Sequence, residues 1–129
     1  MATGYAVTLR NAQLDAITTA VGNAGKLQIY DGTRPATGGT ATTKLAEFTL
    51  GTPFAGAASA ASLSPTLPAN TTGLAAGTAT WFRITTAAGA FVIDGSAGTA
   101  GTDLVLNTAT ISVGVTVSVT GFTINRGNP

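Results

Sequence analysis

The sequence contains no cysteine and no histidine among its 129 residues. Without cysteine, disulfides, zinc thiolate sites and cysteine nucleophiles are excluded. Without histidine, the commonest general base and every Ser-His-Asp arrangement are excluded as well. The acidic residues are few and scattered along the chain: Asp15, Asp31, Glu47, Asp94 and Asp103. We therefore expect that the chain is not an enzyme, and that it has no catalytic, cofactor-binding or metal-binding residues and no cofactor.

Charge is also scarce, since only 9% of the residues are charged and the formal net charge is +1. Nucleic-acid phosphates are bound by clustered Lys and Arg, whereas the basic residues here stand singly, so we expect no nucleic-acid partner. The Ala-rich run at residues 55–63 is too short to cross a bilayer. The first five residues lack the basic and apolar regions of a signal peptide. We expect no membrane partner, and synthesis in the cytosol.

What the sequence does contain is alternation of apolar and polar residues, which predicts strands. Residues 26–30 alternate and then meet the turn dipeptide Asp31-Gly32. Residues 43–50 and 78–85 are predicted as further strands, and residues 87–89 as a turn that leads into residues 91–93. A period of two is typical of strands with one buried face. We predict an all-β fold, an antiparallel β-sandwich that occupies residues 25–129.

A helical pattern precedes this β region. Leu14, Ile17 and Val21 recur at the spacing of one helix face. Thr8 is a suitable N-cap, and Gly22 supplies a stop signal. We predict that residues 1–24 form an N-terminal arm with a short helix, separate from the β domain.

The last part of the chain alternates most clearly, from Ile111 to Val119, and the phase slips at Gly121. A β-bulge at Gly121 explains that slip. Two interpretations of the run itself are open. Either it is one strand with a buried valine face, or Gly114 marks a turn that splits it into a hairpin.

The glycine-rich stretch from Asp94 to Asp103 is similar in composition to loops that bind calcium or phosphate, but it lacks the residues that bind these ligands. It has no bidentate Glu at its end, as an EF-hand needs, and no Lys after its last glycine, as a P-loop needs. We predict a flexible hairpin connection there.

The single tryptophan, Trp81, stands in a predicted strand beside Phe82 and Ile84. This setting favours a core or subunit-interface anchor over a small-ligand platform. Together with the helix face it gives our candidate capsid or subunit contacts, which are Leu14, Ile17, Val21 and Trp81. The long connector at residues 52–77 is a further candidate contact, because loops of that length are usually functional or disordered.

Two stretches carry a family resemblance: residues 25–36 (GKLQIYDGTRPA), followed by Gly-Gly-Thr at 38–40, and residues 77–84 (GTATWFRI). With the Val-Ser-Val-Thr segment at residues 117–120, the chain resembles small virion structural proteins of tailed bacteriophages and prophages. The resemblance implies a capsid decoration (cement) protein or another virion component. It carries over no catalytic or ligand residues.

The function hypothesis is therefore a structural virion protein that binds and stabilises the major capsid shell. Its implied partner is the major capsid protein, with many copies on a particle or a homo-oligomer. Its implied location is the capsid surface, after assembly in the host cytoplasm. Two alternatives are open. One is a tail or head–tail junction component, and the other is a carbohydrate- or receptor-binding β module that uses Trp81 or Tyr30 as a stacking platform.

Overall fold

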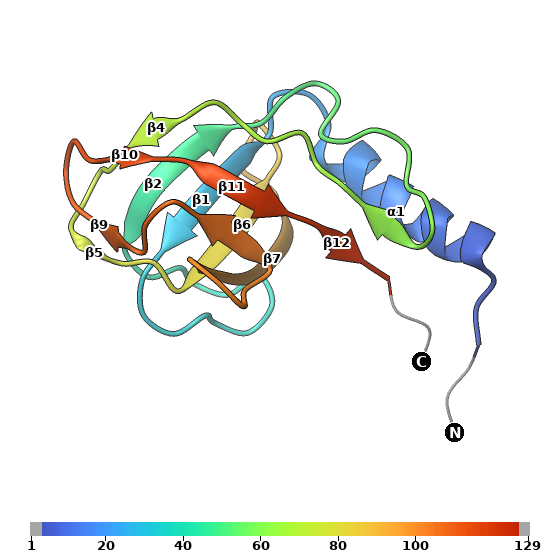
Figure 1. Cartoon of the computed structure of the whole chain (residues 1–129), viewed down its shortest axis with the longest axis horizontal. Coiled ribbons are helices and arrows are strands. Elements are labelled where there is room, and N and C mark those ends of the chain that lie inside the picture. The colour runs from blue at the N-terminus through green and yellow to red at the C-terminus, as the bar shows by residue number, and fades with distance from the viewer. Residues whose placement is uncertain (1–3, 127–129) are drawn as a thin grey trace.

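The computed structural model describes residues 4–126. Within that part of the chain it contains a helix and a series of short strands, shown in Figure 1. They are α1 (Val7–Val21), β1 (Lys26–Tyr30), β2 (Lys44–Thr49), β3 (Ser62–Leu63), β4 (Thr71–Thr72), β5 (Gly77–Thr78), β6 (Trp81–Thr85), β7 (Phe91–Gly98), β8 (Leu104–Leu106), β9 (Thr110–Ile111), β10 (Thr116–Val117), β11 (Val119–Phe122) and β12 (Ile124–Asn125).

The longer strands form one six-stranded sheet in the order β11-β8-β7-β6-β1-β2. Its neighbours are antiparallel except for β7 and β8, which run parallel. The sheet curls around the core, and three two-stranded pairs lie around it: β10 with β4, β12 with β3, and β5 with β9 (Figure 1). The predicted all-β class with a short N-terminal helix is confirmed. The arrangement as a sandwich is not confirmed, because the strands gather in one curled sheet and small pairs.

The central strands follow the predicted alternation. Leu27 and Ile29 of β1 are fully buried, and they lie opposite Ile84 and Phe82 of β6. The turn after Thr85 leads into β7, and Ile84 lies opposite Ile93, so the predicted hairpin is confirmed. These inward-facing side chains build the core that holds the sheet, since each buried side chain of this size contributes about 1.5–3 kcal/mol.

Helix α1 belongs to the same core. Leu14 and Val21 are each 1% exposed and lie in one cluster with the side chains of the sheet. The side chains of Asn11 and Asp15 also fix the helix, because they accept hydrogen bonds from the backbone N–H groups of Ala61 (2.8 Å) and Ala58 (2.7 Å). Helix α1, which lies within the predicted arm at 1–24, thus packs in one hydrophobic cluster with strands of the predicted domain at 25–129.

The ends of α1 fit the prediction in one case and not in the other. Gly22 ends the helix with a φ of 69°, which glycine adopts without strain. The predicted N-cap, Thr8, is wrong: the helix begins one residue earlier at Val7, and Ala6 precedes it with no side-chain cap.

The valine-rich segment is not one continuous strand. Gly114 has a φ of 84° and lies in a turn, in which the Val115 N–H donates to the Ser112 carbonyl. The two halves do not pair with each other, because β9 pairs with β5 and β10 pairs with β4. The turn at Gly114 is thus confirmed, but the hairpin and the single strand are both wrong. The irregularity predicted at Gly121 is confirmed in the pairing of β11 with β8.

The stretch from Asp94 to Asp103 is not a hairpin connection. Strand β7 continues through Gly98, and the chain then loops back so that Ala97 and Gly98 pair in parallel with Leu104 and Val105. Small residues permit this path, because a methyl group on Gly95 would lie 2.7 Å from the Phe82 ring.

Candidate functional site

The structure places three of the four predicted contact residues in the interior. Leu14, Val21 and Trp81 are each 1% exposed, and Ile17 is half-buried against the core. Leu14, Val21 and Trp81 are therefore not accessible at the surface of the folded chain, where a capsid or another subunit would contact them. These side chains fill the chain's own core, and the burial of Trp81 agrees with the core alternative.

Trp81 is covered by the β1–β2 loop, residues 31–43. Its ring stacks on Tyr30 with the centroids 4.4 Å apart. Its indole N–H donates to the Asp31 carbonyl (3.0 Å) and to the Thr42 hydroxyl (3.1 Å). Burial also raises the pKa of the Tyr30 phenol above its ordinary value. Because Trp81 is 1% exposed and Tyr30 is 6% exposed, the two aromatics offer no open platform for a sugar.

A row of polar side chains crosses four strands on this outer face of the sheet. Glu47 (β2), Gln28 (β1), Arg83 (β6) and Asp94 (β7) are successive cross-strand partners. Gln28 donates to the Glu47 carboxylate at 3.0 Å, and Lys44 donates to the same oxygen at 3.0 Å. These two hydrogen bonds hold the pKa of Glu47 below its ordinary value. The row stabilises the sheet from outside the core.

The other half of the row fixes the β1–β2 loop. Arg83 lies over the rings of Trp81 and Phe91, and it donates to the Gly39 carbonyl at 2.6 Å. Arg34 of the loop forms an ion pair with Asp94 at 3.3 Å. Side chains from two strands, β6 and β7, thus hold the β1–β2 loop in place.

An apolar tip forms at the end of the molecule opposite helix α1, where β4, β5, β9 and β10 lie (Figure 1). Val113 is 74% exposed, and Leu74 and Val115 are also exposed. Backbone hydrogen bonds bring their segments together, from the Gly73 N–H to the Val115 carbonyl (2.8 Å) and from the Gly114 N–H to the Gly73 carbonyl (3.0 Å). We call Leu74, Val113 and Val115 the apolar tip. Grouped exposed apolar side chains mark candidate interaction surfaces.

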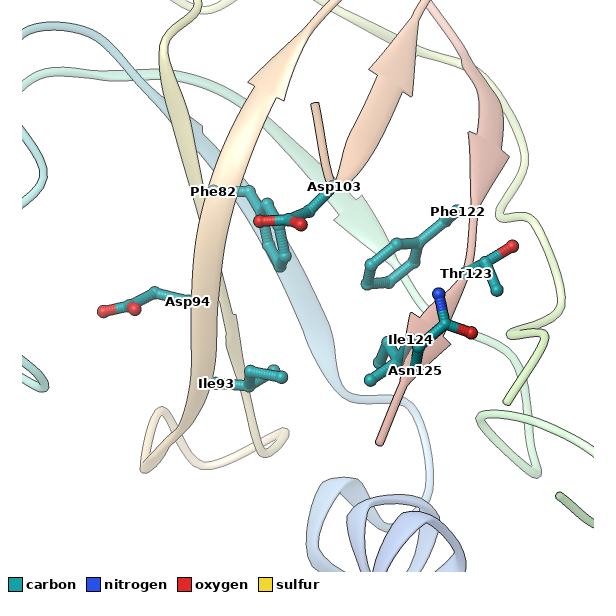
Figure 2. Close-up of a pocket in the computed structure, with 8 residues that line it drawn as sticks. All are labelled: Phe82, Ile93, Asp94, Asp103, Phe122, Thr123, Ile124 and Asn125. Atoms are coloured by element: carbon teal, nitrogen blue, oxygen red, sulfur yellow. The ribbon is translucent and has the colours of Figure 1, made fainter. Parts of the chain in front are cut away.

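A cavity of about 250 Å³ lies between β7 and the segment from β11 to β12. In Figure 2, Phe82, Ile93, Phe122 and Ile124 extend toward this space, and the Asp103 carboxylate lies near its upper end. Asp94 also borders the cavity, but its carboxylate points to the other side of β7, where it pairs with Arg34. Asp103 is held by Ser96, whose N–H and hydroxyl both donate to the same carboxylate oxygen.

The sequence did not point to this cavity or to the apolar tip. The cavity depends on β7 continuing through residues that were assigned to a loop. A glycine inside a strand, here Gly95, often marks a close approach of another group. That sign was present but ambiguous. The tip depends on the turn at Gly114, which was one of two open interpretations.

Within residues 4–126, no group of acidic side chains is placed to hold a metal ion. Helix α1, the helix of this described part, lacks the length and apolar character needed to cross a membrane. No family model matches the sequence, no curated protein matches it, and no solved structure matches the fold.

Proposed function

We propose that this chain is a structural virion protein of a tailed bacteriophage, and that it decorates the capsid by contacts through the apolar tip. The observation that carries the proposal is the tip itself: three exposed apolar side chains, one of them 74% exposed, gathered at one end of a chain with few charges. The resemblance at residues 25–40 and 77–84 supports the virion context.

The position of the tip suits attachment to a shell. Helix α1 and the end of β12 lie together at the opposite end, where Arg126 donates to Gln13 and Arg10 donates to the Arg126 carbonyl. A copy attached by its tip would direct this hydrogen-bonded end away from the shell. Few charges need to be desolvated at such a contact, which lowers the free energy required to form it.

The first test is the copy number in purified particles of the parent phage, measured against the major capsid protein by quantitative mass spectrometry. A ratio of about one, or of about one-third, would support decoration. A few copies per particle would instead favour the tail or the head–tail junction. Absence from the particle would contradict a virion role.

The second test addresses the tip. We expect Val113→Asp to weaken binding to undecorated capsids by about tenfold or more, because a charge buried without a partner costs more than the 1.4 kcal/mol that corresponds to tenfold. Ala87→Asp, an equal charge change at the exposed β6–β7 turn, is the matched control and should bind normally. Normal binding by Val113→Asp would show that the tip is not the docking surface.

A further inference from the structure

The cavity beside β7 has the position of a missing strand. In one row across the sheet, Ala97 of β7 pairs with Leu104 of β8, and Leu104 pairs with Phe122 of β11. Strands are spaced by about 4.8 Å, so β7 and β11 are about 9.6 Å apart in this row, with β8 between them. Strand β8 begins at Leu104, and Asp103, directly before it, is the last residue that lies in line with this strand. Beyond it, no described strand lies between residues 93–95 of β7 and residues 123–125. We call this space the strand gap.

Both sides of the strand gap present backbone hydrogen-bonding groups to it. The Ala97 N–H donates to the Thr80 carbonyl, so the backbone groups of Ala97 face the β6 side of β7. Successive residues of a strand direct their backbone groups to opposite sides, and the N–H and carbonyl of Asp94 therefore face the gap. The Ser96 N–H, which donates to Asp103, confirms that direction. On the other side the Arg126 N–H donates to Ala61 beside β3, so the corresponding groups of Asn125 and Thr123 face the gap.

The floor of the strand gap is apolar and incompletely covered. Phe82 and Phe122 are buried, with their rings edge to face at 5.3 Å, whereas Ile93 and Ile124 are only half-buried. Figure 2 shows all four side chains on the same space. An apolar side chain placed above Ile93 and Ile124 would complete their burial.

The charge at the strand gap has one sign. Asp103 is the one charged side chain directed at it among the described lining residues, since Asp94 is turned toward Arg34. One oxygen of Asp103 accepts both hydrogen bonds from Ser96. A basic group on an occupant would complement this carboxylate.

We propose that the strand gap binds an extended segment of another polypeptide as an added β-strand. The two facing backbone edges provide main-chain hydrogen bonds to an added strand. The apolar floor provides a pocket for a side chain on the face of that strand that points inward. The segment presents an apolar residue to the floor and a basic residue to Asp103. This inference does not depend on the virion proposal.

The test uses the full chain labelled with ¹⁵N and a synthetic probe, the peptide acetyl-Lys-Val-Thr-Val-Lys-amide. Lysine at both ends makes the test independent of strand direction. We expect saturable shifts of the amide signals of Asp94, Thr123 and Asn125, with a Kd below about 1 mM. The matched control is the same peptide with both valine nitrogens methylated, which cannot form the ladder and should bind about tenfold more weakly or worse.

Two variants locate the contacts. Asn125→Pro removes the N–H that faces the gap and leaves the bond from Arg126 to Ala61. It should abolish binding while the Trp81 indole signal stays in place. Asp103→Asn keeps an oxygen for Ser96 but removes the charge, so it should weaken binding severalfold at low salt and less at high salt.

Several results would overturn the proposal. These are the absence of saturable shifts at about 5 mM peptide, equal binding of the methylated peptide, or shifts confined to the apolar tip. Self-association that depends on concentration and is abolished by Asn125→Pro would assign the gap to a second copy, and so would also overturn binding of a different polypeptide. Because the methylated probe leaves the protein unchanged, the test stands even if a variant fails to fold.

Discussion

At the scale of single residues, Gly73 shows how the chain brings the apolar tip together. A methyl group there would overlap the Ser112 carbonyl and lie 2.8 Å from the Ile111 side chain. We expect Gly73→Ala to lower the free energy of unfolding by about 1–3 kcal/mol or more, because neither backbone segment can move away easily. Urea denaturation measures the change. Gly56→Ala, where a methyl group meets nothing within 4 Å, is the control and should stay within about 0.5 kcal/mol. Equal effects at both positions would contradict this packing.

Single residues of the valine-rich segment also show what the sequence could not specify. Val113 and Val117 look alike in the alternating run, yet Val113 is 74% exposed and Val117 is fully buried. The difference arises at Gly114, whose positive φ reverses the chain. Alternation predicts which residues share a face only while the strand continues. Burial of Trp81 was easier to predict, because a large aromatic side chain in a strand among apolar neighbours usually joins the core.

At the scale of elements, helix α1 is a part of the core rather than an arm. We expect Leu14→Ala to lower the free energy of unfolding by about 2–5 kcal/mol, as for other fully buried leucines. Leu9→Ala on the same helix is the matched control, because Leu9 is 46% exposed, and its effect should stay within about 0.5 kcal/mol. Chemical denaturation of both variants measures this. If the two variants were equally stable, the helix would not be docked as the structure has it.

The strands themselves were predictable where periodicity was uninterrupted, as in β1, β2, β6 and the hairpin into β7. The parallel pairing of β7 with β8 was not. Parallel neighbours normally require a crossover of a dozen or more residues, whereas here residues 99–103 alone make the connection. The strand gap results from this short return, because β8 begins too late to cover the first half of β7. No local pattern in the sequence specifies which strands become neighbours.

At the scale of the whole molecule, the scarcity of charge means that ion pairs contribute little to the free energy of unfolding. Within residues 4–126, Arg34 pairs with Asp94 and Lys44 pairs with Glu47, and in each ion pair the basic side chain is partly exposed. Such pairs contribute about 0–1 kcal/mol each. Stability therefore depends on the core that α1 shares with the curled sheet. The fold class could be read from composition and alternation, but the functional surfaces depend on turns and strand order.

If the chain decorates a capsid through the apolar tip, as we propose, that attachment should be insensitive to salt. Apolar contacts are not screened, whereas contacts between exposed charges weaken as the Debye length falls from about 10 Å at 0.1 M to about 3 Å at 1 M ionic strength. We expect the number of copies per particle to change by less than about twofold across that range of sodium chloride, measured by mass spectrometry of repurified particles. The melting temperature of the free chain in the same buffers is the control for effects on the fold. Release of most copies at 1 M, with an unchanged melting temperature, would mean that exposed charges rather than the apolar tip hold the chain on the shell.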